Sequence, residues 1–169
     1  SARLAPVAGA HGPARLDGGS DARALEDELR NALEREEFVL HYQPKVDVDT
    51  RRLAGLEALM RWNSPKRGCV PPLSFIPVLE ETGLIVQAGR WAMRRALSDQ
   101  AWLASQGSHV PRIAVNLSAV QLRQPDFVDS VRDALNGRSA IDLEITESRI
   151  MEDIDANLGK LEELRDLGM

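Results

Sequence analysis

The fold of this chain is decided by the stretch Gly55-Leu56-Glu57-Ala58-Leu59-Met60-Arg61-Trp62. In a β-strand the side chains alternate, so Glu57 and Arg61 share one face while Ala58 and Met60 share the other. A carboxylate is costly to bury unless it is paired with a cation or bound to a metal. The stretch therefore leaves two interpretations of Glu57 open: an ion pair with Arg61, or a ligand of a metal ion.

Length and composition exclude several classes of protein. The chain has 169 residues, 43% of them hydrophobic and 28% charged, which is typical of a folded domain with one core. Its net charge of -5 gives no general attraction to phosphate backbones, so we expect no nucleic-acid partner. Cys69 is the only cysteine, which excludes an intrachain disulfide. No apolar stretch approaches the roughly 18 to 20 residues of a membrane span, and we expect a cytoplasmic domain whose membrane attachment, if any, lies elsewhere.

Hydrophobic periodicity predicts four strands that alternate with helices. Residues 1–20 are rich in Ala, Gly and Pro and are expected to be a linker, so the folded domain covers residues 21–169. The predicted strands cover residues 38–44, 54–62, 112–118 and 141–146, with a loop over 63–72. The predicted helices cover residues 21–33, 74–80, 85–106, 121–135 and 154–167, and Pro125 is expected to break the fourth of them softly. Pro44 is expected to end the first strand, and Ser74 is expected to cap the helix after the loop.

The order of these elements predicts both the fold class and the place of the site. Strands separated by helices long enough for a crossover favour an α/β fold with parallel strands. In such folds ligands bind at the carboxyl ends of the strands. Four polar residues occupy late positions in the predicted strands: Gln43, Glu57, Asn116 and Glu144. Two carboxylates and an amide oxygen suit Mg²⁺ or Mn²⁺. With Arg61 available to bind a phosphate, the set indicates phosphodiester chemistry.

Four further motifs accompany the run from Leu56 to Trp62: Tyr42-Gln43-Pro44, Phe75-Ile76-Pro77 with Glu80 and Gly83, Val115-Asn116-Leu117-Ser118, and Leu143-Glu144-Ile145-Thr146-Glu147-Ser148. Together these motifs resemble the EAL domain, the cyclic di-GMP phosphodiesterase module, and the run from Leu56 to Trp62 is similar to the signature of that family. The motifs occur in the family's order and at about its spacing, from roughly Leu25 to the end of the chain. A lone Glu-Ala-Leu would carry no weight, but the ordered set is specific.

The resemblance implies a TIM-like (β/α) barrel of the EAL type, with an antiparallel first strand and about half of the barrel present in this chain. It implies that Glu57, Asn116 and Glu144 are metal ligands, with Glu57 catalytic. Gln43, Leu59 and Arg61 would contact the cyclic dinucleotide. Two Mg²⁺ or Mn²⁺ ions would activate a water that opens one phosphodiester and leaves linear pGpG.

The family also places two adjacent aspartates, and later a lysine, on strands beyond Met169. We therefore expect the 169 residues alone to be inactive, and we expect the open sheet edge to favour a homodimer. The resemblance further implies an upstream regulatory or cyclase domain in a longer protein. Two other hypotheses stay open: a module that binds cyclic di-GMP without cleaving it, and a non-catalytic dimerisation domain.

Overall fold

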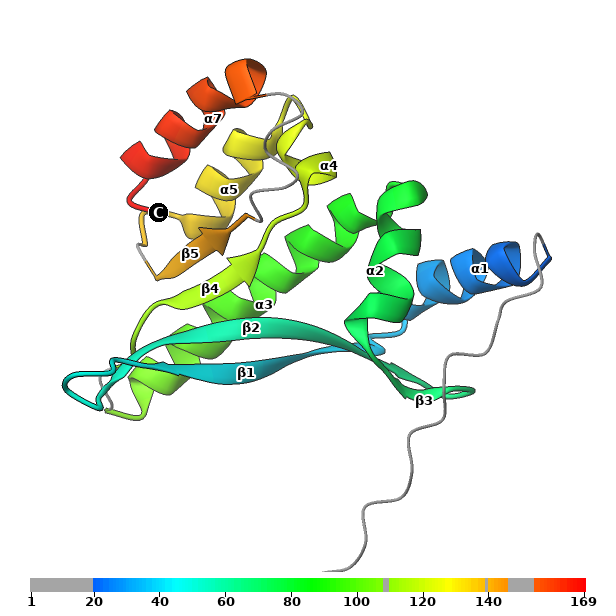
Figure 1. Cartoon of the computed structure of the whole chain (residues 1–169), viewed down its shortest axis with the longest axis horizontal. Coiled ribbons are helices and arrows are strands. Elements are labelled where there is room, and N and C mark those ends of the chain that lie inside the picture. Colours follow the sequence, from blue (N-terminus) through cyan, green and yellow to red (C-terminus); the bar gives the residue numbers. More distant parts are fainter. Residues whose placement is uncertain (1–19, 108–109, 139, 146–153) are drawn as a thin grey trace, which may run out of the picture.

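The computed structural model describes residues 20–107, 110–138, 140–145 and 154–169 (Figure 1). Residues 1–19, which the sequence predicts to be a linker, lie outside this range, as does Thr146 at the end of the last predicted strand. The helices are α1 (Ser20–Glu34), α2 (Pro72–Glu81), α3 (Ile85–Ser105), α4 (Ala119–Leu122), α5 (Phe127–Leu135) and α7 (Ile154–Asp166). The strands are β1 (Phe38–Val46), β2 (Leu53–Ser64), β3 (Gly68–Val70), β4 (Ile113–Asn116) and β5 (Ile141–Glu144).

The strands form one sheet in the order β1-β2-β4-β5, with β3 paired to the far end of β2. β1 is antiparallel to β2, whereas β2, β4 and β5 are parallel to one another. The helices α3 and α5 lie on the connections between the parallel strands (Figure 1). The structure thus confirms the α/β fold and the antiparallel first strand.

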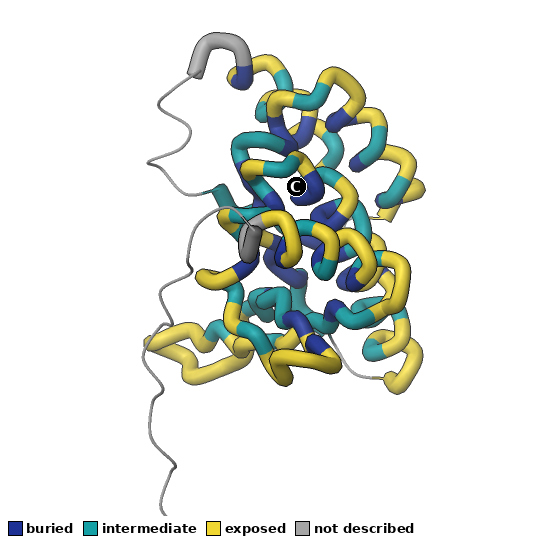
Figure 2. The backbone as a smooth tube through the Cα atoms, turned by 90° about the vertical axis from the view of Figure 1, so that its right-hand side faces the viewer, coloured by how far each residue is buried: buried dark blue, intermediate teal, exposed yellow. Residues whose placement is uncertain are grey.

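One face of the sheet is covered by helices. Its side chains pack against α3, α5 and α7, and the phenol of Tyr42 donates a hydrogen bond to Asp99 of α3 (2.7 Å). We call this the covered face. The helical turns alternate between buried and exposed positions, as expected for helices packed by one side (Figure 2). The core between the covered face and these helices contains buried residues of both layers, including Ala58, Ala92, Ala96, Leu97, Ile113, Val115, Val131 and Ile141.

The opposite face carries the polar side chains. Glu57 lies directly across from Gln43, and Asn116 lies directly across from Glu144. These four side chains are exposed or half-buried, and we call their side of the sheet the open face. The predicted alternation of the opening stretch is therefore correct: Glu57 and Arg61 lie on the open face, and Ala58 and Met60 on the covered one.

A second core cluster lies where β1 and β2 extend beyond the parallel strands. Leu29 of α1 and Phe75 of α2 are both fully buried there. The ring of Phe75 lies 5.6 Å from that of Phe38, and the indole nitrogen of Trp62 donates to Glu37 (3.0 Å). This cluster fixes α2 above the end of β2.

None of the described helices is both long and apolar enough to cross a membrane.

Two predictions about the strands are wrong. Pro44 does not end β1, which continues to Val46, because β1 is an edge strand and a proline there costs no ladder hydrogen bond. The predicted loop over 63–72 contains the short strand β3, whose residue Cys69 pairs with Asn63 of β2. Both differences follow from the place of a strand in the sheet.

One prediction about the helices is wrong, and another is confirmed. Ser74 does not cap α2, which begins at Pro72 because the fixed φ of proline suits the first helical position. The break expected at Pro125 is confirmed, because the helix predicted over 121–135 divides into α4 and α5, with Ser118 as the N-cap of α4. Pro125 lies between them, and the residue before a proline disfavours the helical conformation.

Candidate functional site

Glu57 and Asn116 come together from neighbouring parallel strands. The amide nitrogen of Asn116 donates a hydrogen bond to Oε1 of Glu57 (3.0 Å). Asn116 is the last residue of β4 and is exposed, whereas Glu57 is half-buried within β2. Arg61 instead donates to the carbonyl of Met60 (2.9 Å). Of the two interpretations of Glu57, the described hydrogen bonds therefore give no support to an ion pair with Arg61.

Glu144 lies across from Asn116 and forms an ion pair with Lys45 of β1. The stem of Lys45 passes over Gly55, where a Cβ atom would lie 3.8 Å from its Cδ. Lys45 is a charged residue of this face that the sequence analysis missed. The signal was present, because Lys45 continues the alternation of Gln43, but Pro44 was expected to end the strand.

The three residues predicted to contact a ligand lie along the same face. Gln43 is exposed and stands opposite Glu57 in the antiparallel pair. Leu59 and Arg61 follow Glu57 at two-residue steps and are half-buried. The structure thus brings Gln43 and Leu59 beside Glu57 and places Arg61 further toward the end of β2.

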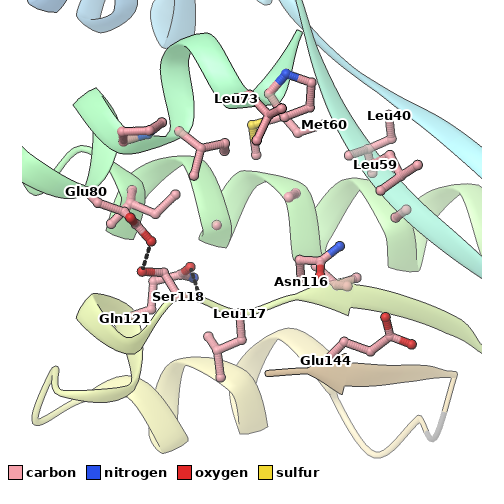
Figure 3. A pocket seen from close by; sticks show the side chains of 18 residues that line it. Leu40, Leu59, Met60, Leu73, Glu80, Asn116, Leu117, Ser118, Gln121 and Glu144 are labelled. Atoms are coloured by element: carbon pink, nitrogen blue, oxygen red, sulfur yellow. Dashed lines mark hydrogen bonds between the residues drawn. The ribbon is translucent and has the colours of Figure 1, made fainter. Parts of the chain in front are cut away.

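A pocket of about 400 Å³ opens at the carboxyl ends of β4 and β5 (Figure 3). Side chains of α2, α3 and β2 supply most of its apolar wall, including Met60, Leu73 and Ile76. Asn116 and Glu144 lie at its rim, and Glu80 of α2 faces Ser118 across its far side (Figure 3). The pocket therefore combines an apolar wall with a few oxygen-bearing side chains, which is typical of a small-molecule site.

The oxygen atoms of this site fit a hard divalent cation. Glu57, Asn116 and Glu144 offer two carboxylates and one amide, the ligand type that Mg²⁺ and Mn²⁺ prefer. A half-turn of the Asn116 amide would bring its oxygen beside Glu57 in place of its nitrogen. In the part of the chain that the structure describes, no group of three or more His, Cys, Asp or Glu side chains is placed to hold a metal. The fit therefore depends on the amide as a third ligand.

The comparisons with known proteins agree with this geometry. A family model described as the EAL domain matches residues 26–169. This chain belongs to the EAL domain family. The relation extends to its structure: the solved "PaMucR Phosphodiesterase, c-di-GMP complex" has a TM-score of 0.79 and 46% sequence identity, over 86% of this chain and 61% of that one.

Two curated relatives of this EAL domain carry names that describe an activity. The bifunctional diguanylate cyclase/cyclic di-GMP phosphodiesterase MucR of Pseudomonas aeruginosa is 46% identical over 86% of this chain. The cyclic di-GMP phosphodiesterase PdeR of Escherichia coli is 38% identical over 85% of it. In both cases the match covers 22% of the relative's own length. The chain thus spans about a fifth of these proteins.

Proposed function

We propose that the protein containing this EAL domain hydrolyses cyclic di-GMP to linear pGpG. The observation that carries this proposal is the bond from Asn116 to Glu57, with Glu144 across from Asn116 on the same face. Together they bring oxygen-bearing side chains of three adjacent strands, β2, β4 and β5, to the same face of the sheet. The names of MucR and PdeR support the choice of substrate.

Five polar residues of the open face have a chemical task in this proposal. Glu57, Asn116 and Glu144 would hold Mg²⁺ or Mn²⁺, which when bound would polarise the phosphate and lower the pKa of a water. Arg61 would donate two parallel hydrogen bonds to a phosphate oxygen pair, which a guanidinium is shaped to do. Gln43 would hold the dinucleotide beside Glu57.

The apolar wall of the pocket suits the flat face of one of the bases of the ligand. Its wall carries Leu59, Met60 and Leu73, and the last of these is 91% exposed. Contact between an exposed leucine at the pocket mouth and a ring of the ligand is favourable, because apolar surface of both the leucine and the ring is removed from water. We assign this pocket to one guanine base of cyclic di-GMP.

The rest of the proposal concerns the larger protein. Because this chain spans 61% of the MucR phosphodiesterase chain, we propose that the 169 residues alone are inactive. We also propose an upstream regulatory or cyclase domain, since MucR is named as bifunctional and the match covers 22% of it. Assembly as a homodimer belongs to the same proposal, and light scattering of the full-length protein tests it.

The decisive experiment compares Glu57→Gln with the wild type in the full-length protein. Turnover of cyclic di-GMP is followed by chromatography of pGpG with Mg²⁺ or Mn²⁺ present. We expect the variant to lose activity on the order of 1000-fold, the scale for removing one group that stabilises developing charge. Asp49→Asn, on the exposed turn between β1 and β2, serves as the matched control and should keep full activity.

The same experiment separates the alternatives. A wild-type protein that binds cyclic di-GMP in calorimetry but releases no pGpG would be a sensing module. A protein that shows neither binding nor turnover would favour a dimerisation domain. A Glu57→Gln variant with normal turnover would contradict the assignment of Glu57.

A further inference from the structure

The junction between β4 and α4 holds Asn116 in place, and it is tied to three other parts of the molecule. Leu117 follows Asn116, and its backbone N–H donates to the carbonyl of Glu144 (2.8 Å). Ser118 comes next and is only 8% exposed. The two residues after Asn116 are therefore fixed by backbone bonding to β5 and by burial.

The side chain of Ser118 links this junction to α2. Its hydroxyl donates a hydrogen bond to Oε1 of Glu80 (2.7 Å), drawn as a dashed line in Figure 3. The same hydroxyl oxygen accepts the N–H of Val120 (3.3 Å), which caps α4. Because the proton and a lone pair of Ser118 are both engaged, its rotamer is fixed by α2 on one side and by α4 on the other.

A second contact ties the junction to α3. The backbone N–H of Ser118 donates to Oε1 of Gln121 (3.1 Å), and Gln121 is only 4% exposed. Its amide lies against Gly89 of α3, where a Cβ atom would be 1.9 Å from Nε2. Gln121 therefore occupies space that a side chain at position 89 would fill. The junction therefore contacts α2 through Ser118 and α3 through Gln121.

We propose that Glu80 is a positioning residue of the phosphodiesterase site, acting through Ser118 on Asn116. This inference rests on the proposed function. Asn116 precedes Ser118 by two residues, so a shift of Ser118 moves the Asn116 amide relative to Glu57. A hydrogen bond to a carboxylate is stronger than one between neutral groups, which makes Glu80 a firm anchor. Displacements of about 1 Å in a catalytic group can cost on the order of 100-fold in rate.

Glu80 also lines the pocket, so a direct contact with the ligand is the alternative to be tested. The two roles predict different patterns. In the positioning role Glu80 acts on Asn116 through Ser118, so once either of the two side chains is removed, removing the other should cost little more. A residue that touches the ligand acts without Ser118, and its loss adds to that of Ser118.

The experiment is a double-mutant cycle with Glu80→Ala, Ser118→Ala and their combination in the full-length protein. Mn²⁺ affinity is measured by calorimetry without substrate, and kcat and KM for cyclic di-GMP are measured separately. We expect each single variant to lose about 10-fold to 100-fold in Mn²⁺ affinity and kcat, the range for groups that orient ligands. KM should change less than twofold, and the double variant should be no worse than either single variant.

Two further variants complete the design. Glu80→Gln keeps an oxygen that accepts from Ser118 and should recover most of the lost affinity. Glu81→Ala removes the neighbouring exposed carboxylate of α2 and should match the wild type. Melting curves accompany every variant, and Ser118→Ala, which deletes a single oxygen, decides the result if Glu80→Ala does not fold.

Three outcomes would overturn the proposal. They are additive losses in the double variant, a Ser118→Ala variant with wild-type affinity, and a Glu80→Gln variant as weak as Glu80→Ala. A wild-type protein without turnover would instead contradict the proposed function, while the Mn²⁺ affinities would still test the link between Glu80 and Asn116.

Discussion

The two faces of the sheet are held together in different ways. On the covered face, Ile113 and Ile141 are fully buried, and their positions are fixed by close packing. On the open face, Glu57, Asn116 and Glu144 are fixed by hydrogen bonds and one ion pair. Stability should therefore depend mainly on the covered face, and activity on the open one. Substitutions on each face test this contrast.

The largest effect on stability is expected at Ile113, a fully buried residue of β4 on the covered face. Ile113→Ala should lower the free energy of unfolding by about 2–5 kcal/mol, from lost burial and the cavity left behind. Urea denaturation followed by circular dichroism measures this loss. Ile113→Val, which removes one methylene, should cost about 0.5–1.5 kcal/mol. Equal stability of the alanine variant and the wild type would contradict the contrast between the faces.

Gly89 tests packing at the junction behind the site. Gly89→Ala should destabilise the protein by about 1–3 kcal/mol, because the new methyl group overlaps Gln121 in a packed interior. Gly159 of α7 is the matched control, since nothing lies within 4 Å of a Cβ there. Gly159→Ala should stabilise by up to about 1 kcal/mol through helix propensity. Opposite shifts in melting temperature for the two alanines are the expected result.

Tyr42 tests a polar contact on the covered face. Its burial, and then its hydrogen bond to Asp99, raise the pKa of the Tyr42 phenol above its usual value. Tyr42→Phe should cost about 1 kcal/mol of unfolding free energy, the net value of one hydrogen bond.

The raised pKa of Tyr42 also gives a pH dependence. The folded state keeps the phenol proton above about pH 10, where the unfolded chain releases it, so stability is full below that pH and falls above it. Tyr42→Phe should remove this part of the alkaline loss. Tyr42 is the only tyrosine of the chain, so the ultraviolet absorbance of tyrosinate follows its ionisation. Ionisation near pH 10 in the folded chain would contradict the prediction.

The smallest effect on stability is expected for Gln43→Ala on the open face. Gln43 is exposed, so the free energy of unfolding should change by less than about 0.5 kcal/mol. Affinity for cyclic di-GMP should fall by about 1 kcal/mol, or roughly fivefold, because one hydrogen bond to the ligand is lost. Calorimetry with the dinucleotide measures the second effect. A variant that loses stability but keeps its affinity would reverse the roles given to the two faces.

Much of the fold could be predicted because alternation and helical spacing are local properties. The face shared by Glu57 and Arg61 follows from strand geometry alone. The extent of β1 beyond Pro44 could not be predicted in this way. A proline is tolerated within a strand only at the edge of a sheet, and the place of a strand in the sheet is not a local property of its sequence. The pairing of β3 with β2 had no local signal either.

The site divides in the same way. Asn116 and Glu144 were identifiable because each is a polar residue at the end of an apolar strand. Glu57 was identifiable as a carboxylate within an apolar strand, but its prediction as a late residue is wrong, because β2 continues for seven residues beyond it. Lys45 was missed through the wrong strand end. Ser118 and Gln121 had a signal that was not used, since a serine followed three residues later by glutamine is the capping-box pattern that α4 shows. The bond from Ser118 to Glu80 joins residues 38 positions apart, and no local pattern contains it.

The reversed direction of β1 decides where the preceding helix joins the domain. Because β1 is antiparallel to β2, its first residue, Phe38, lies beside Trp62 near the far end of β2. Helix α1, which precedes β1, therefore joins the domain beside α2, where Leu29 shares a cluster with Phe75. In an all-parallel sheet the preceding segment would arrive at the other end. A displacement of α1 would therefore act first on α2, the helix that carries Glu80, through this shared cluster and without crossing the sheet.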